Sequence, residues 1–342
     1  MRLSSARIAL SALSSWPKRG RPIAVLVASI GAAAGISGCN PLSQQATSID
    51  VPVVKVGVVP GVDNATLYLA KKRGFFSRAG LDVQIVDFTT VDAELRALSL
   101  GQVDVAAGDY GDLFASQPNL QKNAFKILAD GYDAAPGDVQ IMTMPNSPVQ
   151  DPSQLSLIGA PNVDQVDAPR GGPNSLVIAS ATSVLQSYKV NLSNLSWQSM
   201  SQTQEISQLV SGKLNAVLLT QPYIYLAQQK GAVELVDACS GATAGIPLSG
   251  YFTSTGWARD KTKEVAAFRA GLAQADEQAS MPGPVQSILP EYAKLTKDEA
   301  AQITTGVYPL STVTANLQRT ADLMNFVGMI SRQLNVAKMI AK

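Results

Sequence analysis

The sequence contains no histidine, and its charge is almost balanced, with 27 Lys and Arg residues against 26 Asp and Glu residues. The lack of histidine excludes His-dependent catalytic triads, His-ligated zinc or haem, and His-based pH switches. A net charge of +1 gives no indication of a nucleic-acid partner. Charged residues make up only 15% of the chain and hydrophobic residues 46%, which excludes global disorder. With 342 residues, the chain is long enough to form more than one core.

The amino end differs in charge from the rest of the chain. Positions 1–38 carry five basic side chains and no acidic one, and an uninterrupted run of small and apolar side chains occupies 23–36. Such a run fits the hydrophobic part of a signal peptide and is short for a membrane-spanning helix. It ends in Ile36-Ser37-Gly38-Cys39, which resembles the bacterial lipobox, in which the cysteine is lipidated and the chain is cleaved before it. We therefore expect a lipoprotein signal peptide at 1–38. An ordinary secretory peptide or a buried amino-terminal helix is the alternative.

Cleavage before Cys39 would leave a mature chain of 39–342, with four more acidic than basic side chains. The segment 39–52, rich in Ser, Gln and Thr, would form a flexible tether. Acyl chains on Cys39 would hold the protein on the extracytoplasmic face of the cell membrane. Cys239 then has no partner for an intramolecular disulfide, and we expect a small buried side chain there rather than a nucleophile.

From residue 53 onward, strand-like and helix-like segments alternate, which predicts an α/β fold with largely parallel sheets. A break rich in proline at 145–152 separates two such series, and the chain beyond Tyr251 is expected to be mainly helical. Strands are predicted at 53–59, 82–88, 103–107, 125–129, 139–144, 157–160, 195–199, 214–220 and 233–236. Helices are predicted at 64–73, 175–188, 204–211 and 223–230, and two apolar stripes further on predict helices over 265–279 and 313–334.

A weak internal repeat indicates two similar lobes. The segments 101–106 (GQVDVA) and 212–217 (GKLNAV) each follow an amphipathic helix and open a predicted strand. A glycine that ends a helix before a strand is common in α/β proteins, so chance similarity is the alternative.

Several short motifs together resemble the substrate-binding proteins of nitrate/sulfonate/taurine-type ABC importers and their pyrimidine-precursor-binding relatives. These are KVGV at 55–58, GFF at 74–76, GLDV at 80–83 and GQVDVA at 101–106, and the resemblance covers about 53–256. It implies a type II periplasmic-binding-protein fold, in which two α/β lobes are joined by two crossing segments. Lobe 1 would comprise 53–144 and 251–342, and lobe 2 would comprise 145–250.

The resemblance also implies a function. A member of this family binds a small-molecule solute in the cleft and passes it to a transmembrane ABC permease that works with a cytoplasmic ATPase. It needs no cofactor or metal, performs no chemistry, and is expected to act as a monomer. The sequence departs from the family at 151–157 (DPSQLSL), at Gly171-Gly172-Pro173, and at Thr89-Thr90, where the family has other residues.

Ligand-binding residues are expected beyond the carboxyl ends of the strands, where helix N-termini offer unpaired N–H groups. The positions that meet this condition are Asp63, Asn64, Thr89, Thr90, Asp109, Tyr110, Arg170, Asn174, Ser175, Thr220, Gln221 and Tyr223. Some of these side chains have another plausible role. Asp63, Thr90 and Asn174 are also good helix N-caps, the two tyrosines could pack between elements, and Arg170 could be solvated or pair with Asp167.

The candidate residues include more acids than bases, which favours a neutral or cationic heterocyclic or amine ligand over a sulfonate or nitrate. Two other functions stay open. The protein could present its ligand to a membrane sensor, or it could be a secreted enzyme that uses Asp109 and Asp112. The sequence shows no nucleophile-elbow, phosphate-loop or Cys-x-x-Cys motif that would support an enzyme.

Overall fold

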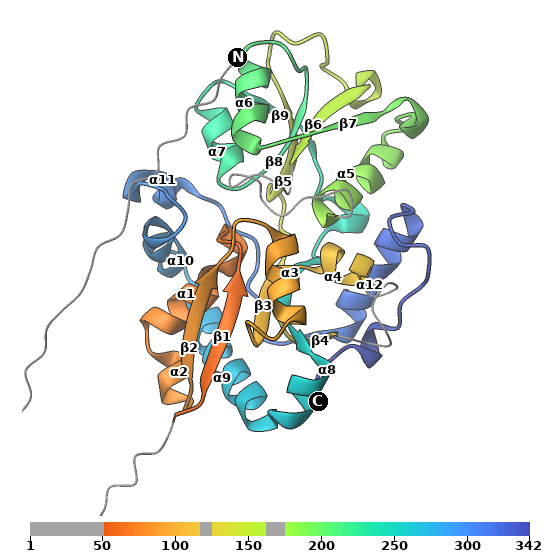
Figure 1. Cartoon of the computed structure of the whole chain (residues 1–342). Helices are drawn as coiled ribbons and strands as arrows, with labels where there is room; N and C mark the ends of the chain where they lie inside the picture. Colours follow the sequence, from red (N-terminus) through yellow and green to blue (C-terminus); the bar gives the residue numbers. More distant parts are fainter. Residues whose placement is uncertain (1–50, 117–124, 162–174) are drawn as a thin grey trace, which may run out of the picture. The chain divides into compact units, whose positions relative to one another are not determined.

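Two five-stranded sheets form the framework of the described part of the chain (Figure 1). The computed structural model describes residues 51–116, 125–161 and 175–342. Cys39, Arg170 and Asn174, together with the expected signal peptide, lie outside these ranges. Within the described residues, no helix is both long and apolar enough to span a membrane.

The first sheet has the strand order β2-β1-β3-β10-β4. Strand β1 (Val53–Val58) pairs in parallel with β2 (Asp82–Asp87) and with β3 (Val105–Asp109). Strand β10 (Pro247–Ser254) lies antiparallel between β3 and β4 (Phe125–Asp133). All of β3 is buried, as expected for a strand with helices on both faces of the sheet.

The second sheet repeats this arrangement in the order β7-β6-β8-β5-β9. Strand β6 (Leu157–Pro161) pairs in parallel with β7 (Ser196–Met200) and with β8 (Val217–Thr220). Strand β5 (Val139–Thr143) lies antiparallel between β8 and β9 (Val233–Asp237). The two sheets define the two lobes, which confirms the expected periplasmic-binding architecture, but both sheets are mixed rather than largely parallel.

Two strands, β5 and β10, do not follow the lobe boundaries that the sequence predicted. Strand β5 belongs to the second sheet, although the expected lobe boundary puts residues 139–144 in lobe 1. Strand β10 belongs to the first sheet and begins at Pro247, before the expected boundary at 250 and in a region where no strand is predicted. The chain therefore crosses between the lobes at 134–138 and again at 238–246. The two crossing segments are hydrogen-bonded to each other, with the Ala134 amide donating to the Ile246 carbonyl at 2.9 Å.

Helices cover the sheets and position the loops at the strand ends. Their bounds are α1 Ala65–Lys72, α2 Phe75–Arg78, α3 Val91–Ser99, α4 Tyr110–Ser116, α5 Leu176–Ser187, α6 Gln202–Val210, α7 Tyr223–Gln228, α8 Thr255–Asp260, α9 Thr262–Ala279, α10 Pro284–Ile288, α11 Lys297–Gln302 and α12 Thr314–Phe326. Short 3₁₀ turns lie at Val62–Asn64 (η1), Pro152–Gln154 (η2), Leu192–Asn194 (η3), Gly241–Thr243 (η4), Leu289–Glu291 (η5) and Val336–Lys338 (η6).

Local sequence explains several of these boundaries. Helix α1 is followed by Gly74, whose φ of 69° lies in the left-handed region that glycine adopts without strain. The hydroxyl of Thr90 accepts from the Ala93 amide and caps α3. Helix α12 ends at Phe326, and the chain turns at Gly328 with φ 80°. The helix expected over 313–334 is therefore shorter than the apolar stripe suggested.

Candidate ligand-binding cleft

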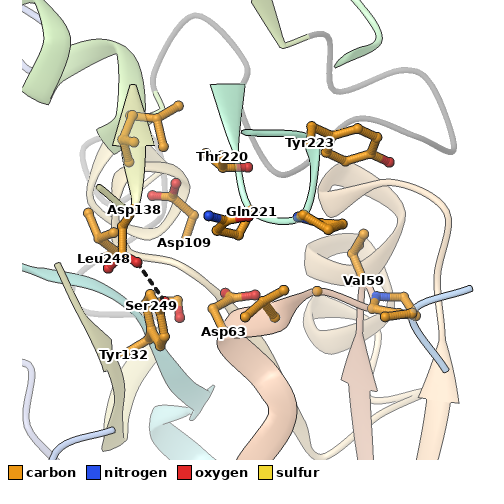
Figure 2. Close-up of a pocket in the computed structure, with 17 residues that line it drawn as sticks. Val59, Asp63, Asp109, Tyr132, Asp138, Thr220, Gln221, Tyr223, Leu248 and Ser249 are labelled. Atoms are coloured by element: carbon orange, nitrogen blue, oxygen red, sulfur yellow. Dashed lines mark hydrogen bonds between the residues drawn. The ribbon is translucent and has the colours of Figure 1, made fainter. Parts of the chain in front are cut away.

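A cavity of about 140 Å³ lies where the strand ends of both sheets meet the crossing segments (Figure 2). Its lining comes from the loop after β1, the ends of β3 and β8, strands β4, β5 and β10, and helices α5 and α7. The lining residues are Val59, Pro60, Gly61, Val62, Asp63, Asp109, Tyr132, Asp138, Val139, Val177, Thr220, Gln221, Pro222, Tyr223, Leu248, Ser249 and Ala293. Ligand sites of open α/β sheets lie at such carboxyl ends.

The loop after β1 is fixed by hydrogen bonds on both sides. The Asn64 side-chain amide donates to the Val59 carbonyl and to the Asp63 carboxylate, both at 3.2 Å, and Asn64 is itself buried. From the carboxyl-terminal part of the chain, Tyr292 donates to the Gly61 carbonyl at 3.2 Å. Asp63 is thus presented to the cavity, while Asn64 supports the loop without lining the cavity.

Asp109 closes the first sheet's side of the cavity. It is the last residue of β3, is 5% exposed, and accepts from the Gly111 amide. The hydroxyl of Ser175, which caps α5 in lobe 2, points toward the other carboxylate oxygen at 3.4 Å. This contact joins the two lobes at the cavity wall.

The first crossing segment contributes Asp138. Its two oxygens accept from the Tyr132 hydroxyl at 3.1 Å and from the Ala135 amide at 2.7 Å. Burial, with a smaller contribution from the charge of Asp237 at the end of β9, raises the pKa of Asp138 to about 7, although the two hydrogen bonds oppose the rise. A titratable group therefore lies both in the cavity wall and in a crossing segment.

The lobe 2 wall is formed by Thr220, Gln221 and Tyr223. The buried Gln202 side chain holds the backbone there, because its carbonyl oxygen accepts from the Thr220 amide at 2.8 Å. The side-chain oxygen of Gln221 is buried and accepts no hydrogen bond from the described residues. In Figure 2, Asp63 faces Gln221 across the cavity. The two lobes thus present polar atoms to the same space.

The structure brings together some of the residues expected from the sequence. Asp63, Asp109, Thr220, Gln221 and Tyr223 line the cavity, and Asn64 and Ser175 support its walls. Three expected residues do not line it: Thr89 is exposed, Thr90 caps α3, and Tyr110 is buried in the core, where its hydroxyl donates to Asp130 at 3.0 Å. Tyr110 turns inward because it starts α4 against Phe114 and Phe252. Arg170 and Asn174 lie outside the described residues.

Among the lining residues that the strand-end argument missed, four have polar or large side chains from elements that it does not cover. Tyr132, Leu248 and Ser249 come from the antiparallel strands β4 and β10, and Asp138 comes from a crossing segment. The sequence around 130–138 contains no motif that predicts a binding site. It also gives no sign of a crossing there, because the proline-rich break indicates one only after residue 144. Among the described residues, no group of three or more Cys, Asp or Glu side chains could hold a metal ion.

Comparison with known proteins identifies the family and supports the fold. The profile of the family described as NMT1/THI5 like matches residues 62–281. No curated protein matches the sequence. Among solved structures, the ligand-binding component of an ABC-type import system from Staphylococcus aureus has a TM-score of 0.68 at 17% identity, covering 84% of this chain and 96% of its own.

Two further structures show how broadly the fold is used. The periplasmic aliphatic sulphonate binding protein SsuA from Escherichia coli has a TM-score of 0.64 at 15% identity, covering 85% of this chain and 97% of its own. A mutant of the enzyme DSZB in complex with biphenyl-2-sulfinic acid reaches 0.66 at 14% identity, covering 85% of this chain and 96% of its own. At such identities the likeness establishes the fold alone.

Proposed function

Because the chain belongs to the NMT1/THI5-like family, we propose that it is an extracytoplasmic solute-binding protein that delivers a small molecule to an ABC permease and its cytoplasmic ATPase. The observation that carries the proposal is the cavity itself, which is lined by both lobes and by a crossing segment. Several structural neighbours are named as binding components of import systems, which supports the same interpretation.

The mechanism follows from the position of the cavity between hinged lobes. A solute that contacts Asp63 and Asp109 on one side and Gln221 and Tyr223 on the other binds the closed arrangement better than the open one. Closure then requires rotation about the two hydrogen-bonded crossing segments. We expect the solute to present N–H or O–H donors, since Asp138 and the Gln221 amide oxygen are acceptors.

We also propose that Cys39 carries the lipid that keeps the protein at the membrane. The support is the sequence motif at 36–39 and the basic and apolar segments before it. Cys39→Ser should move the full-length protein, expressed in a bacterium, from the membrane fraction to the soluble extracytoplasmic fraction. Cys239→Ser is the matched control, because that thiol is fully buried, and it should leave the protein in the membrane fraction.

Binding can be tested on the mature protein by a thermal-shift screen of amines, pyrimidines, sulfonates and nitrate, followed by calorimetry. A true ligand raises the melting temperature by mass action and reduces the radius of gyration measured by X-ray scattering. Gln221→Ala should weaken binding about tenfold, which corresponds to the loss of one buried hydrogen bond. Gln140→Ala, on β5 and outside the cavity lining, is the control.

The outcomes separate the possible functions. Tight binding without turnover of the compound, together with a neighbouring permease gene, supports import. Binding beside a sensor-kinase gene alone supports a signalling module. Turnover of a bound compound would show an enzyme, as the fold of DSZB allows. The enzyme hypothesis based on Asp109 and Asp112 receives no support from the cavity, whose lining includes Asp109 but not Asp112.

A further inference from the structure

A second cavity, of about 490 Å³, lies within lobe 1 at the outer edge of β4. Two isolated bridges cover the ends of this edge, one between Ile127 and Ile340 and one between Asp133 and Val307. Between them, the cavity is bounded by residues 128–130 of β4, one face of α9, the segment 309–312 and residues 340–341. Its volume is that of a site for a small molecule.

One end of this cavity carries a fixed positive charge. The guanidinium of Arg269 donates to the Leu128 carbonyl at 2.6 Å and to the Ala341 carbonyl at 2.8 Å. Both acceptors are neutral, and no ion pair joins Arg269 to a carboxylate in the described part of the chain. The guanidinium is thus held in place while its charge is not neutralised by the protein.

The other end carries two buried carboxyl groups. Asp276 is 5% exposed and Asp130 is 4% exposed, and both line the cavity. Asp130 accepts from the Tyr110 hydroxyl and from the Gly131 amide. Thr66 is the polar side chain beside Asp276. Asp276 and Asp130 lie close enough that the charge of Asp276 raises the pKa of Asp130, in addition to the larger effects of burial and of Asp133.

The two ends are separated along a single helix. Arg269 and Asp276 both belong to α9 and lie on the same helix face two turns, or about 10 Å, apart. A guanidinium and a carboxyl group on one wall of one cavity that do not pair with each other match a molecule that carries both a negative and a positive charge. We propose that this cavity binds a small zwitterion, with its anionic group on Arg269 and its ammonium group on Asp276 and Asp130. This site is distinct from the cleft between the lobes and does not depend on the proposed transport function.

Linear ω-amino acids of increasing length can test the site on the mature protein by calorimetry. Glycine, 4-aminobutyrate and 6-aminohexanoate differ in the distance between their charged groups and so probe the distance between Arg269 and the two carboxyl groups. Hexylamine and hexanoate are controls that each carry only one of the two charges. We expect a longer zwitterion to bind better than glycine, and better than either single-charge analogue. Because the pKa of Asp276 in the protein is about 8, binding of the ammonium group near pH 7 should release protons, which calorimetry in buffers of different ionisation enthalpy detects.

Variants assign the binding to this cavity. Asp276→Asn and Arg269→Gln should each weaken zwitterion binding about tenfold or more, and Asp276→Asn should also reduce the number of protons released, because only Asp130 can then supply one. Arg269→Gln also removes the two hydrogen bonds of the guanidinium and could lower stability for that reason alone. Arg269→Lys retains the positive charge and should therefore bind the zwitterion more tightly than Arg269→Gln. Arg259→Gln, an exposed site on α8, is the matched control.

Gln221→Ala distinguishes this cavity from the cleft between the lobes. Zwitterion binding that survives Gln221→Ala and is lost in Asp276→Asn supports the proposal. Binding that is lost in Gln221→Ala and kept in both cavity variants overturns it, because the ligand then occupies the cleft. No binding of any zwitterion at about 1 mM also overturns it, whereas the cleft ligand would still be found by its own screen.

Discussion

Asp276 provides a direct test of how burial controls a carboxyl group in this fold. Burial raises its pKa from 3.8 to about 8, although the neighbouring Thr66 hydroxyl lowers it. The folded protein therefore holds this proton more tightly than the unfolded chain does. As a result, its contribution to the free energy of unfolding is largest at low pH, is lost as the pH rises from about 4 to about 8, and is constant above that. In Asp276→Asn the free energy of unfolding no longer falls for this reason as the pH rises, because an amide is neutral at every pH.

The size of the effect follows from the shift in pKa. One pKa unit corresponds to about 1.4 kcal/mol, so a shift of about four units sets an upper limit of about 5 to 6 kcal/mol. Water entering the cavity beside Asp276 reduces this value, since the carboxyl group can then be solvated when it ionises. We expect Asp276→Asn to be more stable than the parent by about 2 to 4 kcal/mol at pH 8.5, and by less than about 1 kcal/mol at pH 4.

Urea denaturation of both proteins at several pH values between these limits measures the difference. Asp260→Asn provides the same substitution at an exposed position on α8, and it should change stability by no more than about 0.5 kcal/mol. If the difference between Asp276→Asn and its parent were the same at pH 4 and pH 8.5, the side chain would titrate at its ordinary pKa and the reasoning from burial would be wrong.

Three further predictions concern other parts of the fold and use the same denaturation assay. Gly250→Ala places a Cβ against the Tyr110 hydroxyl and 2.8 Å from the Ala129 carbonyl, so it should lower the free energy of unfolding by at least about 2 kcal/mol. Gly256→Ala is the control, because its Cβ meets nothing within 4 Å, and it should be close to neutral or stabilising. Tyr110→Phe removes a donor to the buried Asp130 and should cost about 1 to 3 kcal/mol; no loss would mean that this hydrogen bond is not formed. Burial raises the pKa of Glu205 well above 4.5, so Glu205→Gln should gain stability relative to its parent as the pH rises from 4 to 8; a gain independent of pH would contradict this.

The parallel part of each sheet could be predicted well from the sequence, because buried strands and amphipathic helices alternate there with glycines at the helix ends. Strands β1, β2 and β3 and helix α1 lie within a few residues of their predicted bounds. Strand β10 was missed because PLSGYFTS contains Pro247 and Gly250, residue types that are depleted in strands, and because it precedes a long helical stripe. Strand β5 was found, but periodicity does not indicate which sheet a strand joins.

The candidate site could be predicted only where a parallel strand ends in the cavity. Asp63, Asp109 and Gln221 follow such strands, and their backbone positions were sufficient to place them. Tyr110 follows the same rule yet faces the core, since a helix starting directly at a strand end can direct a side chain to either side. Asp138 could not be found this way, because it lies on a segment whose place is fixed by contacts between positions far apart in the sequence, such as Gly137 with Asp237.

The internal repeat explains why the chain must cross between the lobes twice. Thr90 and Ser201 occupy equivalent positions in the repeat and cap α3 and α6 in the same way. Glu94 and Glu205 are also equivalent, and each is buried against a glycine of a neighbouring strand, Gly57 and Gly159 respectively. Gly57 pairs with Ala106 and Gly159 with Val217, which form a third equivalent pair. The repeated unit supplies only the three parallel strands of each sheet. The antiparallel strand beside them, β10 in one sheet and β5 in the other, directly follows the other lobe's edge strand. Each sheet is therefore completed by a strand that arrives through a crossing segment, and the first of these segments contributes Asp138 to the wall of the cleft.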